Sequence, residues 1–298
     1  MILQELFEAK SSGKSTAHMG TTRASANDIK SALKFVAKHA GLDLDEIKTS
    51  LIGSTEKTLS GKQKDSGDID IAVEEGSIDR EAVIQKMLDA TGTDEIHRAG
   101  DGVYSFAVPV PGDRKVQVDL MFVASKNWAK FSFHSAPDSE YKAAVRSLLF
   151  VNMMKQIFEE GKDLELKDED DGETFIRVRR SFKADVGLER LFKVRKMRKD
   201  GNGRVKGLAK TDAAGVQAEL DRLGRKDKFD PSPDPITDPD KAAALMFGKG
   251  VSAKDVMSVE QIVALIKKRK DAATVFKNTM DDLREAGHEV PPELEQYK

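Results

Sequence analysis

Two stretches of the chain alternate apolar and polar residues with a period of two, residues 68–71 (DIDI) and residues 115–123 (KVQVDLMFV). In an extended strand, successive side chains point to opposite faces. The isoleucines of the first stretch should therefore face a core, while Asp68 and Asp70 share the opposite face. The same alternation places Asp119 on the polar face of the second stretch. We expect two strands that carry carboxylates.

Longer segments repeat apolar residues at the spacing of an α-helix. They predict helices at residues 27–41, 81–90, 139–161, 211–223 and in the region after Asp240. Short strands are expected at residues 49–52 and 102–108, and a Pro-Gly-Asp turn should join the second to residues 115–123 as a hairpin. The whole pattern predicts an α+β fold with a mixed or largely antiparallel sheet flanked by helices.

Composition divides the chain into four predicted regions. Residues 1–26 contain many Ser, Thr and Gly without periodicity, which favours a flexible N-terminal arm. Residues 27–161 would form the domain that carries the aspartates, and residues 162–225 a basic β-rich extension. Residues 226–298 would comprise a linker, marked by the proline-rich stretch 231–239 (PSPDPITDP), and a C-terminal helical region.

The overall composition excludes several kinds of chemistry. The chain has 298 residues and no cysteine, which rules out disulfides, thiolate zinc sites and cysteine nucleophiles and suits a reducing compartment. Charged residues make up 34% of the chain and balance to a net charge of -2, so total charge favours no class of partner. No apolar run approaches the roughly 20 residues needed to span a bilayer. We therefore expect a cytoplasmic protein with no membrane partner.

Charge is unevenly distributed in the second half of the chain. Residues 177–210 contain 13 Lys or Arg and 3 Asp or Glu, and parts of this segment alternate apolar with basic residues. A small β-element with one basic face would result. That face is either solvated and compensated by the acidic run at residues 163–173, or a surface for an anionic partner such as RNA. Both interpretations remain open at the level of sequence.

The close spacing of Asp68 and Asp70 indicates that a cation binds between them. Two ionised carboxylates about 4 Å apart repel by roughly 4 kcal/mol at an effective dielectric constant near 20. A hard divalent metal with oxygen ligands, Mg²⁺ or Mn²⁺, would relieve this repulsion. Upstream, Gly53 and Ser54 follow a predicted strand as a turn whose backbone N–H groups can face an anion, and Lys57 and Lys64 lie in the spacer that follows.

The order of these residues resembles the signature of the DNA polymerase β-like nucleotidyltransferase superfamily. That signature is an apolar residue followed by Gly and Ser, a spacer, and then an Asp-apolar-Asp-apolar strand. Here it would be formed by residues 52–54 (IGS) and 68–71 (DIDI). The resemblance also implies a third carboxylate on a neighbouring strand, and Asp119 meets that requirement. One departure is Gly67, which stands where many members of the superfamily have serine.

The resemblance implies a reaction and a role for each residue. The protein would transfer a nucleoside monophosphate from a nucleoside triphosphate to an acceptor hydroxyl, with Mg²⁺ or Mn²⁺ as cofactor. The catalytic and metal-binding residues would be Asp68, Asp70 and Asp119. The nucleotide would be held by Gly53, Ser54, Lys57 and Lys64. Residues near the start of the helix at 139–161, namely Tyr141, Lys142 and Arg146, would also contact it.

Other interpretations stay open. The acceptor is most simply RNA, because of the basic segment 177–210, but a protein or a small molecule would suit the same chemistry. The aromatic residues Trp128, Phe131 and Phe133 could stack a base or belong to the core. The chain could also be a non-catalytic binding or structural module that keeps the fold, in a viral or regulatory assembly, or the toxin of a toxin–antitoxin pair.

Overall fold

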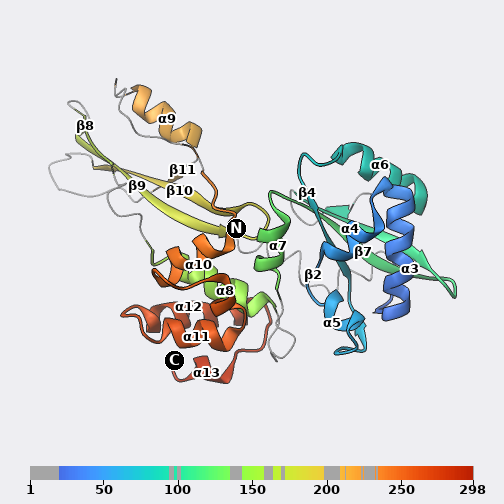
Figure 1. Cartoon of the computed structure of the whole chain (residues 1–298). Helices are drawn as coiled ribbons and strands as arrows, with labels where there is room; N and C mark the ends of the chain where they lie inside the picture. Colours follow the sequence, from blue (N-terminus) through green and yellow to red (C-terminus); the bar gives the residue numbers. More distant parts are fainter. Residues whose placement is uncertain are drawn as a thin grey trace.

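The protein has an α+β fold (Figure 1). The structure is a computed structural model. It describes residues 20–93, 97–98, 102–134, 143–157, 164–168, 172–197, 209–211, 213–222, 224, 232 and 234–297. Among these residues, no helix combines the length and the apolar character that crossing a bilayer would require.

A five-stranded mixed sheet carries the predicted aspartates. Its strands, in spatial order, are β2 (Leu51–Ile52), β4 (Ile69–Glu74), β7 (Arg114–Val123), β6 (Val103–Val110) and β5 (His97–Arg98). The central pair, β4 and β7, is parallel, and the other pairs are antiparallel. Strands β6 and β7 form the predicted hairpin, in which Gly112 and Asp113 adopt positive φ angles of 86° and 54°.

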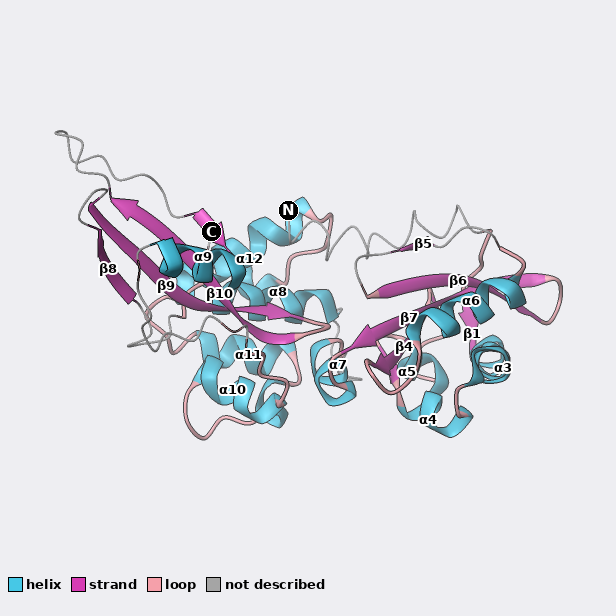
Figure 2. Ribbon diagram, turned by 90° about the horizontal axis from the view of Figure 1, so that it is seen from above, coloured by secondary structure: helices cyan, strands magenta, loops and turns pink. Residues whose placement is uncertain are grey.

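Helices cover one face of this sheet. They are α3 (Ala26–Val36), its π-helical continuation η2 (Ala37–Gly41), and α6 (Arg80–Thr91). Their apolar residues join the alternate apolar residues of β4, β6 and β7 in one hydrophobic core (Figure 2). Helix α6 extends one residue beyond each end of the predicted helix at 81–90, and it ends at Thr91 because Gly92 adopts the left-handed conformation that terminates helices. The shorter helices α4 (Leu44–Thr49) and α5 (Thr55–Leu59) flank β2.

The opposite face of the sheet continues into a second hydrophobic core. Ile52, Ala72, Met121 and Val123 pack there against helices from later in the chain. These are α7 (Lys126–Ser132), α8 (Ala143–Met154), α10 (Pro239–Phe247), η3 (Ala253–Val256), α11 (Val259–Ile266), α12 (Ala272–Glu285) and α13 (Pro292–Glu295). Helices α7 and α8 thus share a core with the C-terminal helices, and α7 links this core to the sheet (Figure 1).

A second, antiparallel sheet follows α8. Its strands are β8 (Leu164–Asp168), β9 (Gly172–Lys183), β10 (Gly187–Met197) and β11 (Ala209–Thr211), in the order β11-β10-β9-β8, and α9 (Ala213–Arg222) follows them. The long ribbon of β9 and β10 extends away from the helical core (Figures 1 and 2). The predicted linker at residues 231–239 is attached to the base of this ribbon. Ile236 and Leu188 exchange two backbone hydrogen bonds of 3.1 and 3.0 Å.

Some predicted segments differ from the structure at their ends. The strand expected from residue 49 begins at Leu51, because Thr49 belongs to α4. The helix expected to reach residue 161 ends at Met154, where tight turns follow and the carbonyl of Lys155 accepts a hydrogen bond from Arg179 of β9. The expected start of that helix, like residues 1–19 of the expected arm, lies outside the described residues.

The last residues of the expected N-terminal arm form regular secondary structure. Ala24 and Ser25 form β1 (Ala24–Ser25), which pairs with β3 (Asp65–Ser66) in the spacer before the aspartates. Ser25 then caps α3 in a capping box with Asp28. A strand of two residues is too short to show a periodic pattern, so the sequence does not reveal that β1 pairs with the distant β3.

Candidate metal and nucleotide site

The structure brings together the three aspartates that the sequence singled out. Asp70 of β4 lies beside Asp119 of β7 in the parallel register, and Asp68 precedes Asp70 by two residues on the same face. One carboxylate oxygen from each residue lies within 4.8 Å of the others. Asp119 is only 6% exposed, and the other two are half-buried. The arrangement is a compact cluster of hard oxygen donors.

Gly53 is required by the geometry next to this cluster. It follows β2 with a φ of +70°, a conformation that side chains disfavour, and a Cβ atom there would lie 2.5 Å from Oδ2 of Asp70. The turn therefore brings the backbone against the carboxylate. The hydroxyls of Ser54 and Ser66 are 2.6 Å apart, and Ser66 is fully buried. This contact orients Ser54, and it gives Ser66 a role that the sequence motif does not assign.

Gln117 is a second neighbour of the site that the motif does not include. Its Nε2 donates to both oxygens of Asp119, at 2.9 Å to Oδ1 and 3.1 Å to Oδ2. Gln117 is 5% exposed, and among the described residues its Oε1 has no hydrogen-bond partner. The spacing in the sequence could have indicated this neighbour, because Gln117 precedes Asp119 by two residues and therefore lies on the same face of the strand.

The two lysines assigned to the nucleotide occupy different environments. Lys57 is half-buried on α5, and its charge acts on His134 of the neighbouring cavity. Lys64 is exposed before β3 and, within the described residues, makes no hydrogen bond or ion pair with the aspartates. Arg23 is a cation that sequence reasoning missed. It pairs with Asp65 at 2.5 Å, and its Nη1 lies 3.6 Å from the position of a Cβ at residue 67, beside the start of the aspartate strand.

A cavity of about 450 Å³ adjoins the Gly53 turn. It lies where α5, α7 and the C-terminal helices meet, and its polar lining includes Glu56, Lys130, His134 and Asp240. Its size falls in the range of small-molecule sites. Because Gly53 lines the cavity and also touches the Asp70 carboxylate, the cavity and the aspartate cluster are neighbours.

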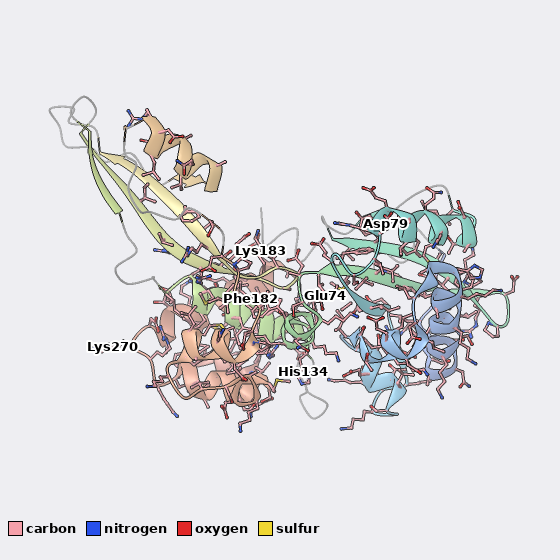
Figure 3. All side chains as sticks on the ribbon, turned by 45° about the horizontal axis from the view of Figure 1, so that its top comes forward. Glu74, Asp79, His134, Phe182, Lys183 and Lys270 are labelled. Atoms are coloured by element: carbon pink, nitrogen blue, oxygen red, sulfur yellow. The ribbon has the colours of Figure 1, made fainter. Side chains whose placement is uncertain are left out.

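His134, after the C-terminal end of α7, faces this junction (Figure 3). Burial, together with the positive charges of Arg146 and Lys57, lowers the pKa of His134 to about 4. The imidazole is therefore neutral at pH 7 and offers one donor and one acceptor to the cavity.

The expected role of Arg146 in contacting nucleotide is wrong. The residue is 1% exposed in the second core, where its Nε donates to the carbonyl of Val256 at 2.9 Å and its Nη1 donates to the carbonyl of Phe131. The guanidinium carbon lies 4.6 Å from the ring centroids of both Phe131 and Phe150. Burial lowers the pKa of Arg146 to about 9. Tyr141 and Lys142, named for the same role, lie outside the described residues.

The aromatic residues in and directly after α7 belong to the core. Trp128, Phe131 and Phe133 are all at most 6% exposed. The indole Nε1 of Trp128 donates to the carbonyl of Lys183, at 2.8 Å, and so ties α7 to the end of β9. Of the two interpretations given for these residues, packing is the one that their burial favours.

Several cations of the basic segment at residues 177–210 are engaged within the protein. Arg180 and Arg190 both pair with Asp234, at 3.1 and 3.2 Å, and Lys183 pairs with Glu189 at 2.5 Å. The side chains at 193–197 and the residues 198–208, which carry much of the remaining charge, lie outside what the structure describes.

Two comparisons with known proteins found no match. No protein-family model matches the sequence, and no curated protein matches it either. What the site can do must therefore be inferred from its geometry and its chemistry.

Proposed function

We propose that the protein is a metal-dependent nucleotidyltransferase, which moves a nucleoside monophosphate from a nucleoside triphosphate to an acceptor hydroxyl. One observation carries the proposal. Three carboxylates from neighbouring strands lie within 4.8 Å of one another, and a glycine turn approaches one of them so closely that a Cβ atom in the turn would force that carboxylate to shift. The order of these residues along the chain supports the same activity through the superfamily resemblance.

The donor set suits Mg²⁺ or Mn²⁺. Asp68, Asp70 and Asp119 offer only carboxylate oxygens, the ligands that these hard cations favour. Gln117, whose amide donates to Asp119, is neutral and itself brings no positive charge into the cluster. Bound there, the metal would neutralise charge on the triphosphate and on the leaving group.

The remaining chemistry follows from the residues of the chain. The Gly53 turn and the Ser54 hydroxyl would hold the triphosphate beside the carboxylates. Asp119, the most buried of the three, would accept the proton of the acceptor hydroxyl. The acceptor oxygen then forms a bond to the α-phosphorus, and the bond between that phosphorus and the bridging oxygen to the β-phosphate breaks, which releases pyrophosphate.

The parts of the substrates away from the triphosphate also need binding surfaces. The cavity beside Gly53 has the volume for a base and sugar, and the charge of Lys57 acts on His134 in its lining. The acceptor that we favour is RNA, since residues 177–210 carry an excess of positive charge. Because three of the described cations there already have carboxylate partners, the charge for RNA would come mainly from residues 193–206.

A labelling experiment tests the proposal. The protein is incubated with Mg²⁺, each of the four α-³²P nucleoside triphosphates, and separate pools of RNA, cellular protein and small metabolites. We expect one pool to be labelled, and the label to disappear with Asp119→Asn. Label in the protein or metabolite pool would replace RNA as acceptor and leave the enzyme class intact. Label in a protein of the cell's own translation machinery would favour a toxin.

A negative result is equally informative. If no pool is labelled while a metal and a nucleotide still bind at the aspartates, the chain is a binding module that keeps the fold without the reaction. If neither binds, the proposed function is wrong.

A further inference from the structure

We infer that Gln117 is a positioning residue for Asp119, which fixes the plane of that carboxylate for the metal. The inference rests on the proposed function in one respect, that the three aspartates bind a divalent cation. It adds a residue that lies outside the recognised motif and outside the set of metal ligands.

The hydrogen bonds of the Gln117 amide define the position of the carboxylate. A single nitrogen lies nearly equidistant from the two oxygens of Asp119, at 2.9 and 3.1 Å. The terminal torsion of an aspartate is broad and only weakly restrained on its own. A donor centred between both oxygens penalises rotation in either direction. Because both side chains are about 95% buried, water competes little for these bonds.

The chemical nature of the donor also matters. A lysine or arginine at position 117 would hold the carboxylate equally well, but it would also supply the positive charge that a metal is expected to bring. An amide holds the carboxylate and leaves its negative charge uncompensated by Gln117. This is the property required of a residue that orients a ligand, and such partners commonly change metal affinity 10- to 100-fold when they are replaced.

The other end of the amide points to the same role. Among the described residues, Oε1 of Gln117 has no hydrogen-bond partner, although the side chain is buried. An unsatisfied buried polar atom normally costs stability. Turning the amide over would not help, because it would set Oε1 against two carboxylate oxygens. The side chain therefore satisfies Asp119 at the expense of its own oxygen, which packing alone does not require.

The test measures binding of Mn²⁺ itself, by calorimetry and by the electron paramagnetic resonance spectrum of the bound ion. The variant is Gln117→Met, which keeps the length of the side chain and removes the donor. The matched control is Ser105→Ala on β6, since Ser105 lies opposite Asp119 in the sheet and is 3% exposed. We expect Gln117→Met to weaken Mn²⁺ binding 10- to 100-fold and to alter the spectrum, and Ser105→Ala to change neither.

The outcomes separate this inference from the proposed function. Equal Mn²⁺ affinity in Gln117→Met and wild type, or equal losses in Gln117→Met and Ser105→Ala, would overturn the role of Gln117 while the metal site stands. No Mn²⁺ binding by wild type would overturn the metal site itself. If Gln117→Met does not fold, Gln117→Leu replaces it, with a circular dichroism melt to confirm the fold, and the same comparison decides.

Discussion

Gly53 shows how a single residue joins the backbone to the chemistry of the site. Two separate constraints meet there, a positive φ of 70° and the distance of 2.5 Å between a Cβ position and Oδ2 of Asp70. Several glycines of the chain share the positive φ angle. The short distance to Asp70 is a property of the aspartate cluster, and its effect can be isolated by comparing Gly53 with a glycine that has a positive φ angle but no such neighbour.

The Gly53→Ala variant should lose both stability and metal binding. The left-handed conformation costs an alanine about 1–2 kcal/mol, and the displaced Asp70 carboxylate should weaken Mn²⁺ binding. Gly61→Ala is the matched control, because Gly61 has a φ of +75° and no atom within 4 Å of its Cβ position. Denaturant unfolding and Mn²⁺ titration measure the two effects. Equal Mn²⁺ affinity in the two variants would mean that Gly53 serves only the turn.

His134 should make the protein less stable in mild acid. Its pKa is lowered to about 4 in the folded state, against 6.5 for the ordinary group, first of all by burial. Between these values the unfolded state binds more protons, so stability falls as pH decreases from about 6.5 to about 4 and the contribution is constant outside that window. His134→Gln should show a smaller loss of unfolding free energy between pH 7 and pH 4 than wild type.

The control for this measurement is His39→Gln, since His39 packs against Phe35 away from the cavity. Carboxylates that titrate in the same window are common to all three proteins and cancel in the comparison. Identical pH dependence in His134→Gln and wild type would show that the imidazole is as well solvated in the fold as in the unfolded chain.

The sequence predicts those residues of the site whose position depends on a local pattern. Asp68, Asp70 and Asp119 lie in stretches where apolar and polar residues alternate, and this alternation alone assigns them to one face of the sheet. Gln117 shares that face, but its bond to Asp119 depends on a rotamer and leaves no pattern. Arg23 lies next to β1, whose pairing with β3 brings it to Asp65, 42 residues away in the chain, and no local property of the chain indicates that contact.

At the scale of the element, α8 is fastened to its neighbours by Arg146. The guanidinium binds the carbonyls of Phe131 and Val256 and so joins α8 to α7 and to η3, two of the elements that surround the cavity. The sequence suggested a nucleotide contact, because an arginine early in a helix after the third carboxylate is indistinguishable from a ligand-binding one. Only the packing of distant helices over α8 buries it.

Replacing Arg146 by lysine should be costly. An ammonium group cannot reproduce the planar fork that reaches two carbonyls while resting on two rings. The loss of hydrogen bonds from a charged donor and the buried carbonyls left behind should lower the free energy of unfolding by about 2–4 kcal/mol. Arg222→Lys is the control, because Arg222 pairs with Glu219 on the partly exposed surface of α9 and should cost less than about 1 kcal/mol. Equal unfolding midpoints in the two variants would contradict this role.

The proline-rich stretch at residues 231–239 shows a different limit of sequence patterns at the scale of elements. Its composition is typical of a linker, yet Asp234 pairs with Arg180 and Arg190, and Ile236 forms a bridge with Leu188. These partners come from β9 and β10. A proline-rich segment has few backbone donors, but tertiary ion pairs can still hold it, and composition does not reveal them.

At the scale of the whole molecule, the sequence pattern predicts the α+β class and the helical C-terminal region, but not how they meet. The apolar residues of α7 and α8 could have covered either face of the sheet or formed a separate core. In the structure they join the C-terminal helices, and the cavity beside Gly53 results from that arrangement. Contacts between residues more than a hundred positions apart, such as Arg146 with Val256, determine it.

Ligand binding should stabilise the whole molecule in a way that depends on the metal. Mg²⁺ or Mn²⁺ with a nucleoside triphosphate should raise the melting temperature, since a ligand at a hundredfold excess over its Kd stabilises the fold by about 2.7 kcal/mol. The double variant Asp68→Asn, Asp70→Asn should lose the metal-dependent part. Asp45→Asn, which removes an exposed partner of Lys48, should keep it. A shift of the same size in the double variant and wild type would place the metal elsewhere.

The proposed choice of RNA as acceptor depends on the basic residues at 195–199. If RNA is the acceptor, reversing Arg195, Lys196, Arg198 and Lys199 to glutamate should weaken RNA binding and flatten its dependence on salt. The log–log slope should fall by roughly 0.7–0.9 for each phosphate that the variant no longer neutralises. Nucleotide binding at the aspartates should be nearly unchanged, because in the proposed function the triphosphate would be held by the Gly53 turn and the metal. RNA affinity is measured by fluorescence anisotropy at several salt concentrations.

A matched control separates this segment from charge in general. Lys30, Lys34, Lys38 and Lys86 are exposed on α3, η2 and α6, on the helix-covered side of the sheet. Reversing these four lysines to glutamate lowers the net charge by the same amount as the 195–199 variant does. RNA binding that falls only in the 195–199 variant supports RNA as the acceptor, since total charge is then not the cause. Equal losses in both variants would indicate attraction without a defined surface, and no loss in either would exclude this segment as the RNA-binding surface. In both of these cases a protein or a small molecule becomes the acceptor to pursue, and the aspartate cluster keeps its proposed role.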